Sequence, residues 1–310
     1  MLQEFRRGQK LMGNHFELTV VDDDAQQAEA GIDAAIAEIS RIEQLLTTYN
    51  DNSQTNQVNA MAGIRPVKVD PEMFALIRRA QRIATVTDGA FDITYGSVDR
   101  SLWNFDRNMK ALPDKATAKK SVHLINYRNV LLNELEGTVF LRERGMRIGF
   151  GGIGKGYAAE QAKQVLISLG VKSGIVNASG DLCAWGTQAD GKPWTVGIAH
   201  PDLAGAPFSA MEISGLAVAT SGNYEKYVVI DGKRYSHTIH PKTGLPVSGI
   251  KSVTIICNNA ELADAMTTPV MVMGVEAGLA LINQIPGLSC LIISDDNQLF
   301  VSKNIKLHYA

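Results

Sequence analysis

The 310-residue chain has few cysteines, and their spacing excludes two kinds of stabilising site. Cys183, Cys257 and Cys290 are odd in number, lie far apart and form no C-x-x-C pair. A disulfide framework and a thiolate zinc site both require closely paired cysteines. We therefore expect three buried thiols that pack as small apolar side chains.

The chain also lacks an excess of positive charge, many aromatic residues and long apolar runs. Thirty Lys and Arg residues stand against 32 Asp and Glu, which leaves a formal net charge of −2, and aromatic residues make up 6% of the chain. No overall positive field is available to hold a nucleic acid, so we expect no nucleic-acid partner. No apolar run is long enough for a membrane-spanning helix or the core of a signal peptide. Such a chain is typical either of a cytoplasmic protein or of an exported protein given without its leader.

Apolar periodicity predicts helices and strands along the whole chain. The predicted helices cover residues 32–45, 71–86, 157–169, 260–273 and 275–282, with Pro269 expected to kink or end the fourth. The predicted strands cover 15–21, 138–142, 146–148, 174–178, several segments up to Cys257, 290–294 and 299–302. Two polar segments, 47–59 and 104–120, are predicted to be a loop of turns and an irregular surface excursion.

The length and this order of elements favour one domain rather than several. A chain of 310 residues can bury a large core, and no internal repeat or low-complexity linker divides it. We expect an α+β fold over residues 1–310, a single compact unit of mixed sheets with flanking helices and a ligand cleft between its subdomains.

A glycine-rich segment, GFGGIGKG, precedes one predicted helix and allows several interpretations. Gly149, Gly151 and Gly154 match the dinucleotide-binding G-x-G-x-x-G pattern, but about half of the chain precedes them and only Asp181 could serve as the ribose-binding acid. A P-loop would need a Ser or Thr hydroxyl for magnesium where Gly156 stands. Close packing of a strand against a helix, with Lys155 as a solvated charge at the helix start, is a simpler alternative. Backbone amides beside a cation nevertheless favour phosphate.

A second polar segment, residues 217–247, combines small residues, hydroxyls and one histidine with strand-like runs. Thr220 and Ser221 offer hydroxyls and amides, and His237 and Thr238 lie on an extended stretch that ends in a Pro-Lys-Thr-Gly turn. Imidazole titrates near neutral pH. The segment therefore suits an anionic ligand and proton transfer.

Eight ordered segments together resemble the ApbE family of FAD:protein FMN transferases over most of the chain. They are MGNHFELTV, TTYNDNSQTNQVN, TDGAFDITYG, GGIGKGYAAE, VNASGDLCAWG, AVATSGNYEKY, YSHTIHPKTGLPV and ELADAMTT. The resemblance implies that FAD is the substrate, that FMN passes to a threonine hydroxyl of a target protein, and that AMP leaves. Cleavage of a pyrophosphate requires neutralised phosphate oxygens and a positioned nucleophile, and Mg²⁺ suits that task.

The resemblance also implies a metal site and catalytic residues. Asp264 and Thr268, one helical turn apart, and the backbone carbonyl of Gly154 correspond to the family's Mg²⁺ ligands. Without the resemblance, Asp264 and Thr268 would be read as an ordinary polar helix face. His237 is the candidate for handling the proton or stabilising phosphate, although a structural histidine is the alternative. His240 stands where the family more often carries Asp, which leaves the pH dependence open, and Gly154 where it often has Ala.

The FAD-binding residues are likewise assigned from the positions that match the family's segments. Tyr49 is expected to stack on the isoalloxazine ring beside Met12, although lone tyrosines and methionines are usually packing residues. Ser179, Gly180 and Asp181 are expected to approach the adenosine or phosphate part of FAD. The other expected contacts are a flavin-contacting turn of Ala90, Phe91 and Asp92, the phosphate-binding Lys155, and the polar residues Thr220, Ser221 and Thr238.

Two other functions remain open at the level of sequence. An FAD pyrophosphatase would use the same Mg²⁺ and site but let water attack, and a non-catalytic FAD-binding protein would not need Asp264. For the transferase, the resemblance implies an acceptor with a Ser/Thr-containing flavinylation motif in a membrane electron-transport complex. It also implies a periplasmic or cell-envelope location with a leader or lipid anchor absent from this chain, and a cytoplasmic location is the alternative.

Overall fold

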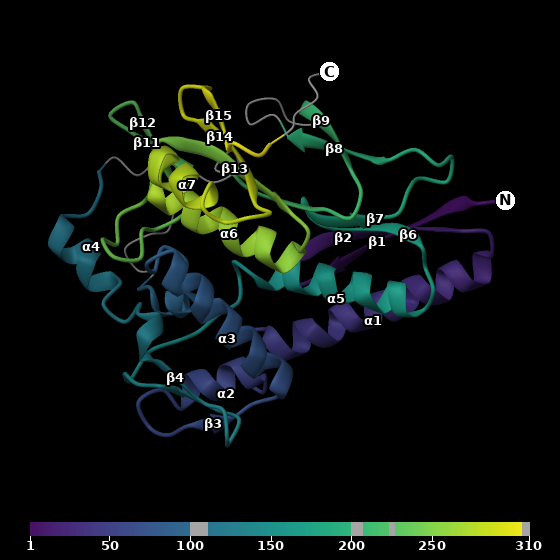
Figure 1. Ribbon diagram of the computed structural model, residues 1–310. Coiled ribbons are helices and arrows are strands. Elements are labelled where there is room, and N and C mark those ends of the chain that lie inside the picture. The colour runs from purple at the N-terminus through teal and green to yellow at the C-terminus, as the bar shows by residue number, and fades with distance from the viewer. Residues whose placement is uncertain (100–110, 200–206, 223–226, 306–310) are drawn as a thin grey trace.

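The computed structural model describes residues 1–99, 111–199, 207–222 and 227–305, and its largest element is an antiparallel sheet of eight strands (Figure 1). Part of the predicted excursion at 104–120 lies outside these residues. The strands follow the spatial order β1 (Gln3–Leu11), β2 (Asn14–Asp22), β6 (Ser173–Ala178), β7 (Asp181–Trp185), β10 (Ala217–Gly222), β13 (Ile250–Cys257), β14 (Ser289–Ser294) and β15 (Leu299–Val301). The predicted α+β class is confirmed.

Helices cover one face of this sheet. They are α1 (Ala25–Leu46), α5 (Gly154–Ser168), α6 (Ala260–Met273) and α7 (Val275–Ile282). Helix α1 packs on β1 and β2, and α5 packs on β6 and β7. Helix α6 packs on β10 and β13, and α7 packs on β14. The apolar spacing that predicted α1 places Ile32, Ile39 and Ile42 entirely inside the core. Helices α1 and α5 lie side by side beneath the strands (Figure 1).

The opposite face of the sheet carries a smaller core under a two-stranded ribbon, β8 (Trp194–Ala199) and β9 (Pro207–Ile213). Trp194, Met211 and Ile213 from the ribbon pack with Val218 and Ile256 from the sheet. Because successive side chains of a strand point to opposite faces, β13 contributes to both cores and is buried at every position.

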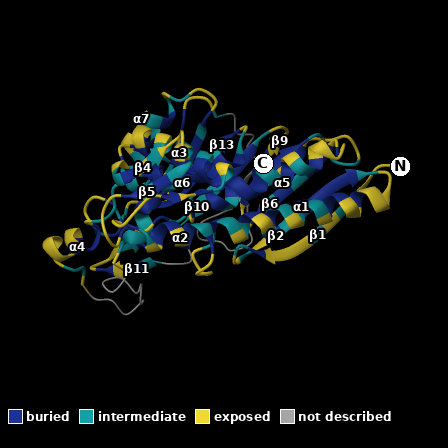
Figure 2. Ribbon diagram, turned by 90° about the horizontal axis from the view of Figure 1, so that it is seen from below, coloured by how far each residue is buried: buried dark blue, intermediate teal, exposed yellow. Residues whose placement is uncertain are grey.

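The remaining elements form a smaller region at the end of the helical layer and a strand ribbon beside it. They are α2 (Gln54–Ala60), β3 (Val67–Lys68), α3 (Pro71–Val86), η1 (Ile93–Ser97), α4 (Lys115–Ser121), η3 (Tyr127–Asn129), β4 (Val130–Asn133), β5 (Thr138–Leu141), β11 (Tyr227–Ile230) and β12 (Lys233–Ser236). Figure 2 shows that α4 and the edge strand β1 are largely exposed, whereas the inner strands are buried.

Two helices occur where the sequence predicted loops, and both begin at side-chain caps. Ser53 accepts a hydrogen bond from the Asn56 N–H at the start of α2, and Asp114 accepts from Ala116 and Thr117 at the start of α4. Such caps stabilise short helices that apolar periodicity cannot reveal. The interpretation as irregular was wrong for 54–59 and 115–120, whereas 47–53 form the predicted loop of turns.

Three further differences separate the predicted strands and helices from the observed ones. Residues 146–148 form no strand, because the backbone N–H and carbonyl of Ile148 bond the side chain of Asn59 at 2.7 and 3.1 Å instead. Strand β1 was not predicted. Pro269 was expected to kink or end its helix, and the second outcome is wrong because α6 runs on to Met273. Proline removes only one N–H, and the buried packing of the helix outweighs that loss.

The three cysteines are buried free thiols, as predicted, and burial raises the pKa of Cys183, Cys257 and Cys290. A raised pKa leaves a thiol protonated and unreactive at neutral pH. Among the helices of the described residues, none has the length and apolar character required to cross a membrane.

Candidate functional site

Two tight turns place predicted site residues at the same end of the main sheet. Met12 and Gly13 join β1 to β2 with φ of 51° and 74°, and Ser179 and Gly180 join β6 to β7 with φ of 58° and 99°. Positive φ at both central residues is the geometry of two-residue hairpins. Because Phe16 pairs with Ala178, the two turns are neighbours, although 167 positions separate Met12 from Ser179.

The adjoining strands bring further polar residues to this end. The Val218–Leu182 pair aligns the end of β10 with the start of β7, so the Thr220 N–H donates to Asp181 Oδ1 at 3.2 Å. The hydroxyls of Thr220 and Thr254 are 2.9 Å apart. The register of the sheet thus collects hydroxyl and carboxylate oxygens that the sequence places far apart.

Helix α5 begins at the same place and supplies a cation. Lys155 forms an ion pair with Asp181, whose side chain is almost fully buried. A Cβ built on the neighbouring Gly154 would lie 3.5 Å from the terminal methyl of Met12. The helix start, the first hairpin turn and β7 therefore meet, which brings together three residues that the resemblance assigned to different parts of FAD.

Asp264 of α6 faces the same helix start and is only 5% exposed. Its carboxylate accepts a hydrogen bond from the Gly156 N–H at 2.9 Å. The pKa of Asp264 is raised to about 7, mainly by burial and also by the negative charge of Asp181, while Lys155 acts to lower it. Two buried carboxylates thus share one lysine, an arrangement that favours an additional cation.

Gly156 determines how closely α5 and α6 approach. A Cβ at this position would lie 2.2 Å from the Ala260 carbonyl oxygen and 2.6 Å from Asp264 Cβ. The two helices therefore touch backbone to backbone, and the close packing expected of the glycine segment joins two helices here rather than a strand and a helix.

Thr268, one helical turn after Asp264, meets Phe91 at the glycine segment. A Cβ on Gly152 would lie 3.6 Å from the Phe91 ring and 3.8 Å from Thr268 Oγ1. The turn that begins at Ala90 is therefore adjacent to the predicted metal site. Burial raises the pKa of Asp92, whose oxygens accept from the N–H and hydroxyl of Thr94 and the N–H of Tyr127.

The loop with Tyr49 lies beside the same segment. Asn56 donates to the carbonyls of Thr48 and Asn50, on either side of Tyr49, and a Cβ on Gly149 would lie 3.9 Å from the Thr48 methyl. The Tyr49 side chain itself is 97% exposed. An exposed aromatic ring on a loop held by hydrogen bonds is suited to stack on the ring of a bound ligand.

His237 and Thr238 approach the site from the segment after β12. His237 is exposed, and Thr238 Oγ1 lies 3.9 Å from the sulfur of Met271, three residues after Thr268. Ser221, the last residue but one of β10, is half-buried beside Thr220. Contacts of neighbouring residues thus bring the segments with Tyr49 and His237 toward this region, and both side chains are exposed to solvent.

His240 performs a local structural task. Its Nδ1 accepts a hydrogen bond from the Lys242 N–H at 3.1 Å, and its carbonyl accepts from Thr243 and Gly244. An aspartate commonly bonds the N–H two residues on in the same way. Burial lowers the pKa of His240, and nearby Lys242 lowers it further, which favours the neutral imidazole that this turn requires.

The potential ligands around Asp264 are oxygen atoms, which suit a hard cation, and they do not form a cluster of acidic or imidazole side chains. Within the described ranges, no three His, Cys, Asp or Glu side chains are grouped to hold a metal. An ion beside Asp264 would therefore need hydroxyl or backbone oxygens, such as the predicted Thr268 and Gly154. Oxygen ligands of this kind match the preference of Mg²⁺.

Three features of the site were missed from the sequence: Thr254, the Gly156 N–H and the Lys155–Asp181 pair. All three depend on contacts between segments far apart along the chain. The sequence offered one signal in advance, the glycine that follows Lys155. The reason for a glycine at this position becomes clear only when α6 is seen to pack against it.

The fold and the site define an α+β protein with a carboxylate–lysine cluster at one end of an antiparallel sheet, between two helix backbones. Residues 12–292 match the ApbE family. The chain belongs to this family and is a transferase.

Relatives and solved structures resemble it over nearly its whole length. An FAD:protein FMN transferase of Klebsiella pneumoniae is 31% identical over 88% of this chain and 84% of its own, and one of Treponema pallidum is 30% identical over 98% and 88%. The ApbE protein of Thermotoga maritima superposes with a TM-score of 0.86 at 31% identity, over 97% of both chains. The apo flavinyl transferase ApbE of Pseudomonas stutzeri superposes with a TM-score of 0.85 at 26% identity, over 97% of this chain and 95% of its own.

Proposed function

We propose that the protein transfers FMN from FAD to a threonine hydroxyl of a target protein, with Mg²⁺ as cofactor and AMP as the leaving group. The observation that carries this proposal is the buried Asp264 against the Gly156 N–H, beside the Lys155–Asp181 pair. The names of the relatives support the flavin chemistry, and the oxygen donors around Asp264 support the metal.

The proposed reaction exchanges one phosphoester bond for another. The threonine oxygen attacks the phosphorus on the FMN side of FAD, the bond to the bridging oxygen breaks, and AMP departs with that oxygen. His237 takes the hydroxyl proton, because imidazole can accept it near neutral pH. Lys155 offers its charge to the phosphates, and Mg²⁺ held by Asp264, Thr268 and the Gly154 carbonyl would neutralise the phosphate oxygens.

The residues that we propose to bind FAD lie in the same region. The exposed ring of Tyr49 stacks on the isoalloxazine with Met12 and the 90–92 turn beside it. The Ser179–Gly180 turn, Asp181 and the hydroxyls at the end of β10 contact the adenosine and phosphates, together with Thr238. An FAD pyrophosphatase is the second candidate, since the exposed side of the site also admits water.

We also propose an acceptor and a location. The acceptor is a protein with a Ser/Thr-containing flavinylation motif, such as a subunit of a membrane electron-transport complex. The reaction then takes place in the periplasm or at the cell envelope.

The deciding experiment mixes the protein with FAD, Mg²⁺ and a candidate acceptor domain and weighs the intact acceptor by mass spectrometry. A mass gain equal to phosphoester-linked FMN, lost when the acceptor threonine is replaced by alanine, supports the transferase. AMP and free FMN without modified acceptor support the pyrophosphatase. No AMP under any condition contradicts both enzymes and supports a binding protein.

The metal assignment has its own test in Asp264→Ala. We expect Mg²⁺-dependent AMP release to be abolished, because the buried carboxylate that accepts a hydrogen bond from the Gly156 N–H is removed, while FAD binding persists in part. Asp296→Ala, which changes an exposed aspartate, is the control and should match the wild type. Unchanged AMP release in Asp264→Ala would remove this residue from the metal site.

A further inference from the structure

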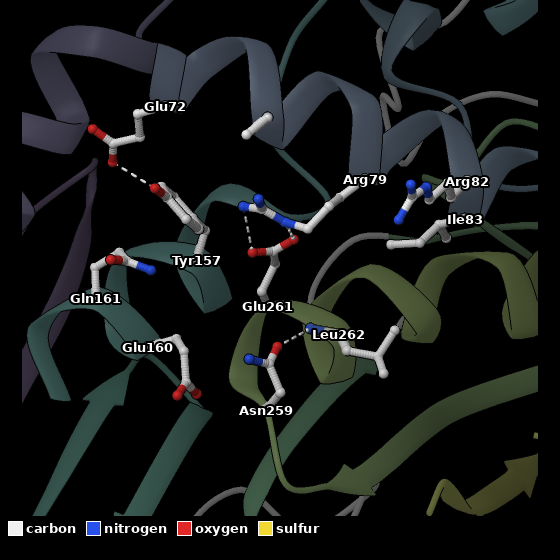
Figure 3. Close-up of a pocket in the computed structure, with 11 residues that line it drawn as sticks. Glu72, Arg79, Arg82, Ile83, Tyr157, Glu160, Gln161, Asn259, Glu261 and Leu262 are labelled. Atoms are coloured by element: carbon white, nitrogen blue, oxygen red, sulfur yellow. Dashed lines mark hydrogen bonds and ion pairs between the residues drawn. The ribbon is translucent and has the colours of Figure 1, made fainter. Parts of the chain in front are cut away.

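A cavity of about 610 Å³ lies outside the site, between α3, α5 and the start of α6 (Figure 3). Arg79, Tyr157 and Glu261 line it together with Glu72 and Glu160. Its walls are the outer sides of the same two helix starts whose inner sides carry Gly156 and Asp264. The contacts that hold these walls in place therefore also influence the positions of Gly156 and Asp264.

Ion pairs and hydrogen bonds join the walls to α3. Arg79 of α3 donates from Nε and Nη2 to the two carboxylate oxygens of Glu261, at 2.6 and 2.9 Å. The Tyr157 hydroxyl donates to Glu72, and the Arg79 guanidinium lies 5.6 Å from the centre of the Tyr157 ring. Arg79 thus contacts the first turns of both α5 and α6.

The first turn of α6 is fixed from its other side as well. Glu160 of α5 accepts a hydrogen bond from the Ala260 N–H at 2.9 Å, and it forms an ion pair with Lys163 at 2.8 Å. Asp264 follows Glu261 by three residues, less than one helical turn. A shift of Glu261 is therefore transmitted directly to Asp264 through the helix.

We propose that Arg79 is a positioning residue for Asp264, an inference that rests on the proposed function of the metal site. Its two-pronged bond holds Glu261, which is 8% exposed, and so fixes the start of α6 against α5. Without Arg79, the Glu261 carboxylate is left buried and unneutralised, and rotation of the first turn toward water relieves it. That rotation pulls Asp264 away from the Gly156 N–H, where the backbones already touch.

Isothermal titration of the metal-free protein with MgCl₂, in the presence of FAD, measures this effect on binding. We expect Arg79→Met to weaken Mg²⁺ binding about tenfold or more, the usual effect of losing an outer support of a metal ligand. Arg79→Lys, which keeps the charge but loses the two-pronged geometry, should fall between Arg79→Met and the wild type. The KM for FAD should stay within about twofold, because no FAD contact is changed.

Arg78→Met is the matched control. Arg78 lies on the same helix and pairs with the exposed Glu134 at 3.0 Å, away from α5 and α6. The Arg78→Met variant should bind Mg²⁺ with the affinity of the wild type. A second variant, Glu261→Gln, removes the buried charge, so the double variant Arg79→Met/Glu261→Gln should recover part of the Mg²⁺ affinity that Arg79→Met loses.

The outcomes separate positioning from a merely structural role. If Arg79→Met lowers the melting temperature but its folded fraction binds Mg²⁺ like the wild type, the inference is wrong and Arg79 serves stability alone. If Arg79→Met does not fold, Arg79→Lys and Glu261→Gln decide by the same titration. A wild-type protein that binds no Mg²⁺ and releases no AMP refutes the proposed function, and the inference with it.

Discussion

At the scale of single residues, the absent side chain of Gly156 determines how closely α5 and α6 pack in the candidate site. The glycine lets the N–H of α5 reach the Asp264 carboxylate while the Ala260 carbonyl passes within a distance that no Cβ tolerates. The sequence placed this glycine in a phosphate-binding pattern, and the structure shows that it also determines helix packing.

We predict that Gly156→Ala destabilises the protein by about 2 kcal/mol or more, because the clash is with backbone and cannot be relieved by a rotamer change. Gly151→Ala is the control in the same segment, since a Cβ there would meet nothing within 4 Å, and it should change stability by less than about 0.5 kcal/mol. Urea unfolding measures both. Equal effects of the two substitutions would show that the close approach of α5 and α6 is not rigid.

The candidate site residues came from a family resemblance rather than from residue types alone, and neither indicated the bonds between them. Asp264, Thr268 and His237 came from their places in segments that resemble a family, and nothing in those segments indicated that Lys155 binds Asp181. That pair depends on the position of α5 relative to β7, which local sequence does not encode.

At the scale of elements, helix periodicity was a reliable guide and short capped elements were not. Helices α1, α3 and α6 are long enough for their apolar stripes to be read from the sequence. Helices α2 and α4 have seven residues each, so a single cap outweighs any periodic pattern. Strand β1 is exposed along most of its length, and without a buried face it shows little of the expected alternation.

The turn at His240 should make the folding stability of the protein depend on pH. Because the pKa of His240 is lowered in the folded protein, the neutral imidazole and its bond to the Lys242 N–H contribute stability above the ordinary histidine pKa. This contribution is lost as the pH falls through the folded pKa. Between pH 7.5 and 5, the melting temperature of the wild type should therefore fall more than that of His240→Asp, whose carboxylate still accepts the bond.

Differential scanning fluorimetry of the two proteins across this range tests the prediction. Comparison with His240→Asp cancels the titration of the five other histidines, which both proteins share. Parallel curves would show that protonation of His240 does not disturb the turn.

At the scale of the whole molecule, the eight-stranded sheet with a core on each face is the most protected part of the fold. Strand β13 is buried at all eight positions and is bonded on both sides, whereas β11 and β12 form an isolated two-stranded ribbon. Isolated hairpins are marginally stable in water. Opening free energies should differ accordingly between these segments.

We predict that hydrogen–deuterium exchange is slowest in peptides that cover 250–257 and at least about a hundredfold faster in those that cover 227–236, since local opening does not require global unfolding. Mass spectrometry of peptic fragments measures both in one experiment. Similar rates in the two regions would mean that the ribbon is held by contacts as strong as those of the main sheet.

The sequence by itself determined the α+β class, the long helices, the buried cysteines and the family's ordered segments, because these depend on local periodicity, residue type and motif order. Tertiary structure alone decided the strand order, the neighbouring hairpin turns at Met12 and Ser179, and the contact of Gly156 with Asp264. The physical reason is that these features depend on contacts between separate segments of the chain: 167 positions separate Met12 from Ser179, and 108 separate Gly156 from Asp264. Their geometry follows from sheet register and helix packing, which arise only when the whole chain is folded.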